Sequence, residues 1–329
     1  MEHPENDDQY KGLKVNKGIA DVPTVNPYIK KRAQRKVYTP SEFVEGILKG
    51  NITILSQAVT LVESSKHEHQ QVAQEIIEKC LPFAGKSVRI GITGVPGAGK
   101  STSRMEALSR EKNAFIRPSP SAGSLGGVAR KTRETIVLCE AAGFDTVFVE
   151  TVGVGQSETA VHSMVDFFLL IQLAGTGDEL QGIKRGIMEM ADGIIINKAD
   201  GDNIEKANLA AAQFRNALHL FPPSESGWFP KVLTYSGYYN LGIKEIWDMV
   251  GEYMEFTKKN GYFDYKRNEQ AKYWMYESIN DTLRDKFYHN PAVEGMLEQT
   301  EKQVLNNEIS SFVAAKRMID LFLDNIATK

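Results

Sequence analysis

The 329-residue chain lacks the cysteine content, the charge excess and the long apolar runs that mark several classes of protein. Its two cysteines, Cys80 and Cys139, cannot form a disulfide framework and indicate reduced thiols in a cytoplasmic protein. The 39 basic and 42 acidic residues nearly balance, so we expect no nucleic-acid partner, which would call for a basic excess. The longest apolar run, residues 166–174, is far shorter than the roughly 20 residues that cross a membrane, and the polar N-terminus does not resemble a signal peptide.

The pattern of residues changes along the chain and predicts four parts. Polar residues with several prolines predict a flexible arm over residues 1–38. Three apolar stripes at helical spacing predict a helical module over residues 39–86. Residues 87–260 alternate apolar strands with helices, which predicts an α/β domain with a mostly parallel sheet covered on both faces. Residues 261–329 are typical of long amphipathic helices, which either pack on the sheet domain or form a subunit contact.

The expected strands are short and are separated by helical patterns. They cover residues 88–93, 146–151, 167–171, 193–197 and 232–236. We expect His67 and His69 in the connection between the second and third helices of the helical module. Two histidines without a third ligand nearby indicate polar side chains in contact with water rather than a metal site.

The segment after the first expected strand satisfies the pattern G-x-x-x-x-G-K-[S/T] of nucleotide-binding P-loops. Its glycines let backbone N–H groups turn toward phosphate oxygens, and a helix N-terminus after the loop adds positive potential. Lys100 would oppose the charge of the β- and γ-phosphates, and the Ser101 hydroxyl would bind Mg²⁺. The predicted nucleotide-binding residues of this segment are Gly94, Val95, Pro96, Gly97, Ala98, Gly99, Lys100, Ser101 and Thr102.

A second motif, of the N-K-x-D type found in GTPases, ends the fourth expected strand. The Asp200 carboxylate can accept both the N1–H and the 2-amino protons of guanine, which adenine does not offer in that arrangement. Asn197 would tie this loop to the P-loop and the base edge, and the apolar stem of Lys198 would lie along the ring. Ser236 and Gly237 follow the next strand, where GTPases place a backbone N–H against guanine O6.

A third motif, Glu-Thr-Val-Gly, ends the strand expected over residues 146–151. Glu150 would order Mg²⁺ through water, and the N–H of Gly153 would reach the γ-phosphate, so this loop would sense hydrolysis. Many GTPases place a catalytic glutamine directly after this glycine. Here Val154 takes that position and Gln156 lies two residues further on, which predicts slow intrinsic hydrolysis.

Together these motifs resemble those of the MeaB/ArgK family of P-loop GTPases. The resemblance is carried by residues 93–101, 115–134, 149–158 and 177–184, and it is strong over residues 40–260. It implies a GTPase chaperone of the adenosylcobalamin-dependent methylmalonyl-CoA mutase, which gates cofactor loading and protects the mutase. It also implies a homodimer built through the C-terminal helices.

The resemblance further implies that residues 177–184 form a third switch, in which Lys184 joins the catalytic residues and couples the nucleotide state to the mutase. From the residues alone, this segment is a charged, glycine-rich loop after a buried strand. An older family label leaves a transport-linked (lysine/arginine/ornithine) kinase or ATPase as one alternative function. A GTP-dependent metallochaperone is another, although it would call for a Cys/His cluster, and the sequence shows none.

The chain departs from the family just after the P-loop. Family members carry roughly three dozen more residues between the P-loop Ser-Thr pair and the segment that starts at Arg104, while here Thr102 is almost joined to it. A P-loop helix needs about three turns to cross a sheet, yet only a short stretch separates Ser101 from the strand-like residues 114–116. Either the printed sequence omits a stretch at this junction, or the chain has a true deletion that impairs Mg²⁺ binding.

The residues beyond Gly261 predict a homodimer, because their helices are too few to form a core yet are rich in apolar side chains. We expect these side chains to line the contact between two copies of the chain. They are Trp274, Ile279, Leu283, Phe287, Met296, Leu297, Phe312, Met318, Ile319, Leu321 and Phe322.

The substitution Lys100→Ala is expected to abolish GTP hydrolysis and weaken nucleotide binding while the fold stays intact, because the only role predicted for this side chain is to oppose phosphate charge. Hydrolysis is followed by phosphate release and folding by circular dichroism. Loss of the circular dichroism signal at ordinary temperature would show that Lys100 has a structural role instead.

Overall fold

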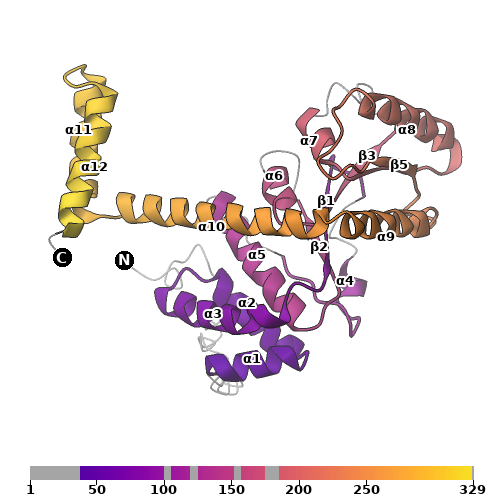
Figure 1. Cartoon of the computed structure of the whole chain (residues 1–329), viewed down its shortest axis with the longest axis horizontal. Coiled ribbons are helices and arrows are strands. Elements are labelled where there is room, and N and C mark those ends of the chain that lie inside the picture. The colour runs from indigo at the N-terminus through magenta and orange to yellow at the C-terminus, as the bar shows by residue number, and fades with distance from the viewer. Residues whose placement is uncertain (1–37, 100–104, 119–124, 152–156, 175–184, 328–329) are drawn as a thin grey trace, which may run out of the picture. The chain divides into compact units, whose positions relative to one another are not determined.

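A computed structural model describes residues 38–99, 105–118, 125–151, 157–174 and 185–327 of the chain (Figure 1). The chain divides into two units, Met1–Thr39 and Pro40–Lys329. The arm predicted for residues 1–38 lies almost entirely outside the described residues, and the described helices and strands all belong to the second unit. None of the helices in its described part is long and apolar enough to cross a membrane.

A five-stranded, wholly parallel sheet forms the centre of the second unit, with the strand order β2-β1-β3-β4-β5. The strands are β1 (Val88–Gly94), β2 (Thr146–Glu150), β3 (Phe167–Leu173), β4 (Gly193–Asn197) and β5 (Lys231–Thr234). Each differs from its predicted range by no more than two residues at either end. The α/β class and the parallel sheet predicted from the sequence are therefore confirmed.

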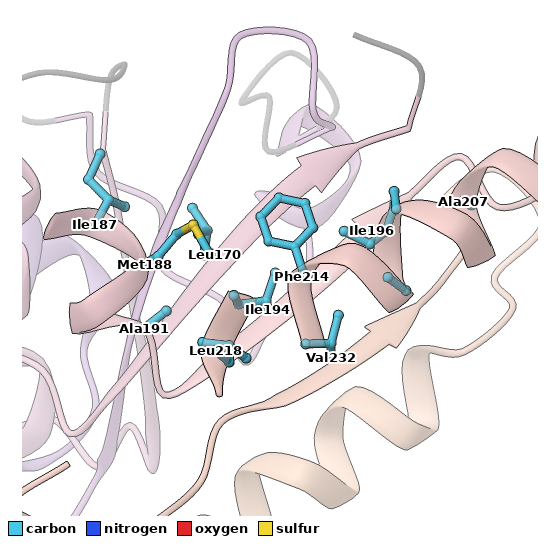
Figure 2. Packing of buried hydrophobic residues seen from close by; sticks show 12 residues of the cluster. Leu170, Ile187, Met188, Ala191, Ile194, Ile196, Ala207, Phe214, Leu218 and Val232 are labelled. Atoms are coloured by element: carbon cyan, nitrogen blue, oxygen red, sulfur yellow. The ribbon is translucent and has the colours of Figure 1, made fainter. Parts of the chain in front are cut away.

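Alternate residues of the inner strands face two different layers of helices, as the two-residue repeat of a strand requires. On β4, Ile195 belongs to the cluster under α9 (Ile243–Lys259), whereas Ile194 and Ile196 belong to the cluster under α8 (Ile204–Leu218). Figure 2 shows this second cluster, in which α7 (Arg185–Met190) also packs. Burial on both faces explains why these strands are continuous apolar runs rather than alternating ones.

A third cluster covers the part of the sheet near β1 and β2. It joins α5 (Leu125–Ala141), α6 (Ser157–His162) and α10 (Tyr262–Tyr288) around Phe168 of β3. The fully buried Phe168 is also in edge-to-face contact with His162, with ring centroids 5.5 Å apart. Burial lowers the pKa of His162 to about 4, helped by the nearby charge of Lys266, so its imidazole is neutral at pH 7.

The three helices predicted for the N-terminal module are α1 (Pro40–Leu48), α2 (Ile52–Glu63) and α3 (His67–Cys80), and they pack against each other and against α5. The expected position of His67 and His69 is wrong, because both lie in the first turn of α3. The ring of His69 instead forms a hydrogen bond of 2.8 Å with the hydroxyl of Ser64, which helps to hold the turn before this helix.

The two cysteines are free thiols in the interior, as the sequence predicts. Burial raises the pKa of Cys80 to about 11 and that of Cys139 to about 12. Since the thiolate is the reactive form, both side chains are unreactive packing residues at neutral pH.

The segment after the P-loop contains little regular structure in the described residues. The helix α4 (Met105–Leu108) has four residues, and residues 114–118 form no strand. The strand suggested for residues 114–116 is therefore wrong. Arg117 is instead held by an ion pair with Glu63 at the end of α2, so this stretch runs along the N-terminal helices rather than joining the sheet.

The C-terminal helical segment consists of α10, α11 (Pro291–Leu305) and α12 (Ser311–Ala327). The sequence left open whether the C-terminal helices pack on the sheet domain or form a subunit contact. The helix α10 packs on the sheet domain, against α9 and α5. The helices α11 and α12 pack against each other, and the buried Met318 of α12 contacts Thr300 of α11.

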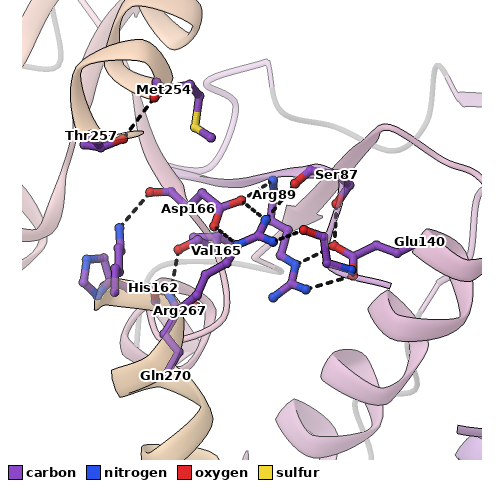
Figure 3. A network of polar contacts seen from close by, with 12 residues as sticks. Ser87, Arg89, Glu140, His162, Val165, Asp166, Met254, Thr257, Arg267 and Gln270 are labelled. Carbon is purple, nitrogen blue, oxygen red and sulfur yellow. Dashed lines mark hydrogen bonds and ion pairs between the residues drawn. The ribbon is translucent and has the colours of Figure 1, made fainter. Parts of the chain in front are cut away.

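Buried ion pairs fix α10 to the amino-terminal edge of the sheet (Figure 3). The guanidinium of Arg267 donates to both carboxylate oxygens of Asp166 at 2.8 Å and to the backbone oxygens of Gly85 and Ser87. The same Asp166 carboxylate accepts a hydrogen bond from the backbone N–H of Arg89 in β1 at 2.8 Å. Arg267 therefore joins α10 to the start of β1 and to the turn before β3.

A second buried pair lies beside the first. The Arg89 guanidinium donates to both carboxylate oxygens of Glu140 in α5 at 2.8 Å, and the Ser87 hydroxyl and the Gly85 N–H donate to the same carboxylate. Burial alone would raise the pKa of Glu140, but the hydrogen bonds and charge of Arg89, with the two smaller donors, hold it below its ordinary value. Glu140 is therefore ionised at neutral pH.

The substitution Arg267→Ala is expected to lower the free energy of unfolding by about 3–5 kcal/mol, because it leaves the buried Asp166 carboxylate with an unpaired charge. Urea unfolding followed by circular dichroism measures this change. The control is Lys272→Ala in the same helix, which removes an exposed pair with Glu269 and should leave the unfolding midpoint unchanged. Equal midpoints for the two variants would contradict the anchoring role of Arg267.

Candidate nucleotide-binding site

The predicted site residues gather at the carboxyl ends of the parallel strands. Gly94 ends β1, Glu150 ends β2 and Asn197 ends β4. In the strand register, Glu150 lies opposite Ile92 and Gly94 lies opposite Ile171 of β3. Open parallel sheets bind ligands along this edge, so the topology brings together three motifs that lie far apart in the sequence.

Two glycines of the P-loop lie where the backbone approaches other groups too closely for a side chain. A Cβ atom on Gly94 would lie 2.1 Å from the backbone oxygen of Ile171. Gly99 has a φ of +92°, which favours glycine, and a Cβ atom there would lie 2.3 Å from Nδ2 of Asn197. The P-loop thus packs directly on the guanine motif.

Asn197 joins three segments of the site through one carboxamide. Its Nδ2 donates to the backbone oxygen of Ala98 in the P-loop at 2.7 Å. Its Oδ1 accepts from the N–H of Lys198 at 2.7 Å and from the N–H of Gly237 at 3.1 Å. The side chain is buried. Asn197 therefore makes the contact with the P-loop that the motif predicts, and its contact with a base stays a prediction.

Asp200 is oriented by the turn that follows β5. One of its carboxylate oxygens accepts a hydrogen bond from the Ser236 hydroxyl, which in turn accepts from the N–H of Tyr239 at 3.2 Å. Ser236 is fully buried, and its backbone pairs with Leu241 to close the turn. The hydroxyl fixes one oxygen of Asp200. This orienting role of Ser236 is not part of the sequence prediction, which used only its position beside Gly237.

The backbone N–H of Gly237 donates to Oδ1 of Asn197. The contact of a backbone N–H in the segment of Ser236 and Gly237 with guanine O6 stays a prediction. Lys198 has a φ of +61° and an exposed side chain, and Asn203 donates to its backbone oxygen at 2.8 Å. Hydrogen bonds at the N–H and at the carbonyl oxygen of Lys198 hold its strained backbone. These bonds do not involve the side chain, so its apolar stem is available for the face of a base.

A pair of threonines links the P-loop strand to the strand that carries Glu150. The Thr151 hydroxyl donates to the Thr93 hydroxyl at 3.0 Å, and the Thr151 N–H donates to the backbone oxygen of Ile92 at 3.0 Å. Both threonines are buried. This link is not part of the sequence prediction, although a threonine at the end of each of two neighbouring strands indicates it.

Five predicted residues lie outside the described residues, namely Lys100, Ser101, Thr102, Gly153 and Lys184. Their roles stay predictions. Within the described ranges, no group of three or more His, Cys, Asp or Glu side chains could hold a metal ion. The half-buried Glu150 offers the carboxylate oxygen that Mg²⁺ prefers, and the hydroxyl predicted to accompany it is that of Ser101.

A P-loop at the end of a central parallel strand, packed on an N-K-x-D motif whose aspartate is oriented by a serine, defines the class of P-loop proteins that bind guanine nucleotides. Comparison with known proteins gives the family. The family model described as "Methylmalonyl Co-A mutase-associated GTPase MeaB" matches residues 55–103 and 103–292. The chain belongs to this family and is a GTPase.

Relatives of the chain support this assignment. It is 43% identical to a putative GTPase of Caulobacter vibrioides, over 84% of this chain and 95% of the relative. It is 38% identical to the GTPase ArgK of Escherichia coli, with 83% and 93% covered, and 38% identical to the mitochondrial methylmalonic aciduria type A homolog of Mus musculus, with 84% and 78% covered. A crystal structure of an LAO/AO transport system kinase superposes with a TM-score of 0.72 at 34% identity, with 88% of this chain and 100% of that chain covered.

The family match divides at Ser103, where the sequence predicts a junction. The alignment with the Caulobacter vibrioides relative runs over 312 residues, but 84% of this 329-residue chain is only about 276 residues. About 36 positions of the alignment therefore have no counterpart in this chain, in agreement with the three dozen residues predicted to be absent. The four-residue α4 is too short to cross the sheet as a P-loop helix does.

The substitution Gly99→Ala is expected to weaken GDP binding, because a Cβ atom would push Asn197 away from Ala98. A buried hydrogen bond left unmade costs about 1–3 kcal/mol, which corresponds to a loss of roughly 5- to 150-fold in affinity. Isothermal titration calorimetry measures the change. The control is Gly251→Ala in α9, where a Cβ atom meets open space. Unchanged GDP affinity in the Gly99 variant would contradict the packing role given to this contact.

Proposed function

We propose that this GTPase is a chaperone of an adenosylcobalamin-dependent methylmalonyl-CoA mutase, which gates cofactor loading and protects the mutase. The description of its family and the name of its relative from Mus musculus support the mutase as client. The observation that carries nucleotide recognition is the Asn197 carboxamide, which joins the P-loop to the turn after β5 beside the oriented Asp200. The proposal assigns nucleotide binding to residues 87–260 and dimerisation to residues 261–329.

Six of the predicted site residues have separate tasks in this proposal. Asp200 accepts the two guanine protons while Ser236 holds its carboxylate in place. Lys100 opposes the charge of the β- and γ-phosphates, and the N–H of Gly153 contacts the γ-phosphate. Ser101 and Glu150 hold Mg²⁺, directly and through water respectively, and this ion supplies charge neutralisation at the phosphates when bound.

The substitution Asp200→Ala is expected to remove most of the preference for GDP over ADP. Guanine loses the acceptor for two of its donors, and each mispaired polar group costs about 1–3 kcal/mol. Titration of both nucleotides into wild type and variant measures the preference. The control is Asp202→Ala, an exposed carboxylate two residues away that should leave it unchanged. Equal affinities for GDP and ADP in the wild-type protein would contradict guanine recognition.

The client can be tested by capture of the mutase from the same cells with the chain locked by a nonhydrolysable GTP analogue. We expect methylmalonyl-CoA mutase to be retained, and we expect the pair to load adenosylcobalamin only with GTP present. Lys184→Ala should leave GDP affinity nearly unchanged but alter the effect of the mutase on the hydrolysis rate, if residues 177–184 act as a switch. Equal stimulation of the wild type and the variant would exclude this role for Lys184.

A transport-linked kinase is the second candidate, because the superposed crystal structure carries that name. The two functions differ in the fate of the γ-phosphate. A GTPase releases it to water, whereas a kinase transfers it to a protein or metabolite. Incubation with γ-labelled GTP should therefore release only inorganic phosphate.

The proposed homodimer depends on apolar side chains of the C-terminal helices that remain exposed in one copy. Two side chains that the sequence assigned to this contact are instead buried within the chain: Trp274 packs under α6, and Met318 packs on α11. Exposed apolar side chains remain along α10, α11 and α12, and they include Ile279, Leu283, Leu305, Phe312, Val313, Ile319 and Leu323.

The double substitution Phe312→Glu and Val313→Glu is expected to convert a dimer at micromolar concentration into a monomer, because it would bury two charges in the contact. Sedimentation velocity measures the oligomeric state. The control is Leu220→Glu, which changes an equally exposed apolar side chain just after α8. A wild-type chain that sediments as a monomer would contradict the proposed dimer.

A further inference from the structure

Two buried side chains of α10 hold the end of α6. The Nε2 atom of Gln270 donates to the backbone oxygen of Val165 at 2.8 Å and to that of His162 at 3.4 Å (Figure 3). One turn further along α10, the indole N–H of Trp274 donates to the backbone oxygen of Ser163 at 3.0 Å. Gln270 is 6% exposed and Trp274 is 7% exposed.

The backbone oxygens involved belong to His162, the last residue of α6, and to Ser163 and Val165 shortly after it. The last turn of a helix leaves its carbonyl groups without partners inside the helix, so α10 supplies the donors that α6 lacks. With six residues, α6 is only about 9 Å long. Its first residue, Ser157, comes four positions after Gly153, the predicted contact of the γ-phosphate.

The packing around these hydrogen bonds joins the end of α6 closely to α10, so that a change at one is felt at the other. The indole of Trp274 lies in one cluster with Val161 and Met164, and the guanidinium of Arg133 in α5 lies 5.9 Å from its ring. Oε1 of Gln270 is buried without a hydrogen-bond partner among the described residues. An unpaired buried acceptor costs stability, and here the same amide offsets that cost through the hydrogen bonds that its Nε2 donates to the end of α6.

We propose that Gln270 and Trp274 are positioning residues for GTP hydrolysis. They fix the far end of α6, the helix that follows the strand ending at Glu150, and so position the phosphate side of the site. Because they belong to α10, the same contacts join the nucleotide state to the C-terminal helices. The proposal rests on GTP hydrolysis at the strand edge described above, and it concerns the coupling of that edge to α10.

The first test compares two tryptophans that make the same type of hydrogen bond. In Trp274→Phe the indole donor to Ser163 is lost, and in the control Trp228→Phe the matching donor to the backbone oxygen of Asp192, at 2.9 Å, is lost. We expect kcat for GTP hydrolysis to fall about 2- to 10-fold in the Trp274 variant, the equivalent of one hydrogen bond, with GDP affinity unchanged. The control variant should keep the wild-type kcat.

A second variant distinguishes a loss of hydrolysis from a loss of folding. Gln270→Met is close in shape, and it removes the unpaired buried oxygen together with the two donated hydrogen bonds. We therefore expect it to unfold near the wild-type midpoint while its kcat falls as in Trp274→Phe. Wild-type kcat in this folded variant would overturn the role of Gln270.

Tryptophan fluorescence tests whether the bound nucleotide changes the surroundings of α10. The chain has three tryptophans, Trp228, Trp247 and Trp274, so each can be observed alone. The variant Trp228→Phe/Trp247→Phe keeps Trp274 as the sole reporter, and Trp247→Phe/Trp274→Phe keeps Trp228. We expect the emission of Trp274, but not that of Trp228, to change when GDP is exchanged for a nonhydrolysable GTP analogue.

Identical Trp274 spectra with both nucleotides, with binding of each verified by calorimetry, would overturn the inference, as would an equal loss of kcat in Trp274→Phe and Trp228→Phe. A wild-type chain that binds neither nucleotide contradicts the nucleotide site itself. That result would be obtained before any variant is compared, so the two failures are distinguishable.

Discussion

The carboxamide of Asn197 is the contact on which the candidate site depends. Its donor holds the P-loop at Ala98, and its acceptor holds the turn after β5 at Gly237. No other side chain type of this size offers a donor and an acceptor in one rigid plane. The close approach that results also explains Gly99, since any side chain there would displace the amide. Three distant segments of the sequence are thus kept in register by one residue.

The two edges of the sheet have different physical tasks. At the carboxyl edge, groups are left exposed enough to meet a nucleotide, and Asp200 and Glu150 are only half-buried. At the amino edge, Asp166, Arg89 and Glu140 are buried; Arg89 is paired with Glu140, and Asp166 is paired with the half-buried Arg267 (Figure 3). Buried pairs of this kind hold a geometry rather than bind a ligand, because a single missing partner is costly. They make α10 a fixed part of the sheet domain.

The position of α10 gives the C-terminal helices a physical connection to the nucleotide site. Along one face of this helix, Arg267 contacts the base of the sheet, and Gln270 and Trp274 contact the end of α6. The helix α6 in turn follows the strand that ends at Glu150. A second copy or a client held by α11 and α12 would therefore be linked to the phosphate side of the site through packed helices.

Much of this protein could be predicted from its sequence because the informative signals are local. Five apolar runs predicted the strands, and three short motifs predicted the P-loop, a turn for guanine and a carboxylate for Mg²⁺, of which the strands are confirmed. Local signals also failed in identifiable places. The position of His67 and His69 was predicted wrongly because the polar first turn of α3 resembles a connection in the sequence. The strand at residues 114–116 was predicted wrongly because an apolar run does not show that Arg117 beside it pairs with Glu63.

Partners far apart in the chain were decided only by the tertiary structure. Amphipathic spacing indicated that Trp274 and Met318 are buried, but it did not indicate which segment covers them. Both were therefore predicted to lie in a subunit contact, whereas other helices of the same chain cover each of them. The pairing of Arg267 with Asp166 joins residues 101 positions apart. The sequence determined which chemical groups are present and which side of each helix is apolar. The structure decided which groups meet, because hydrogen bonds and ion pairs depend on distances that no local pattern contains.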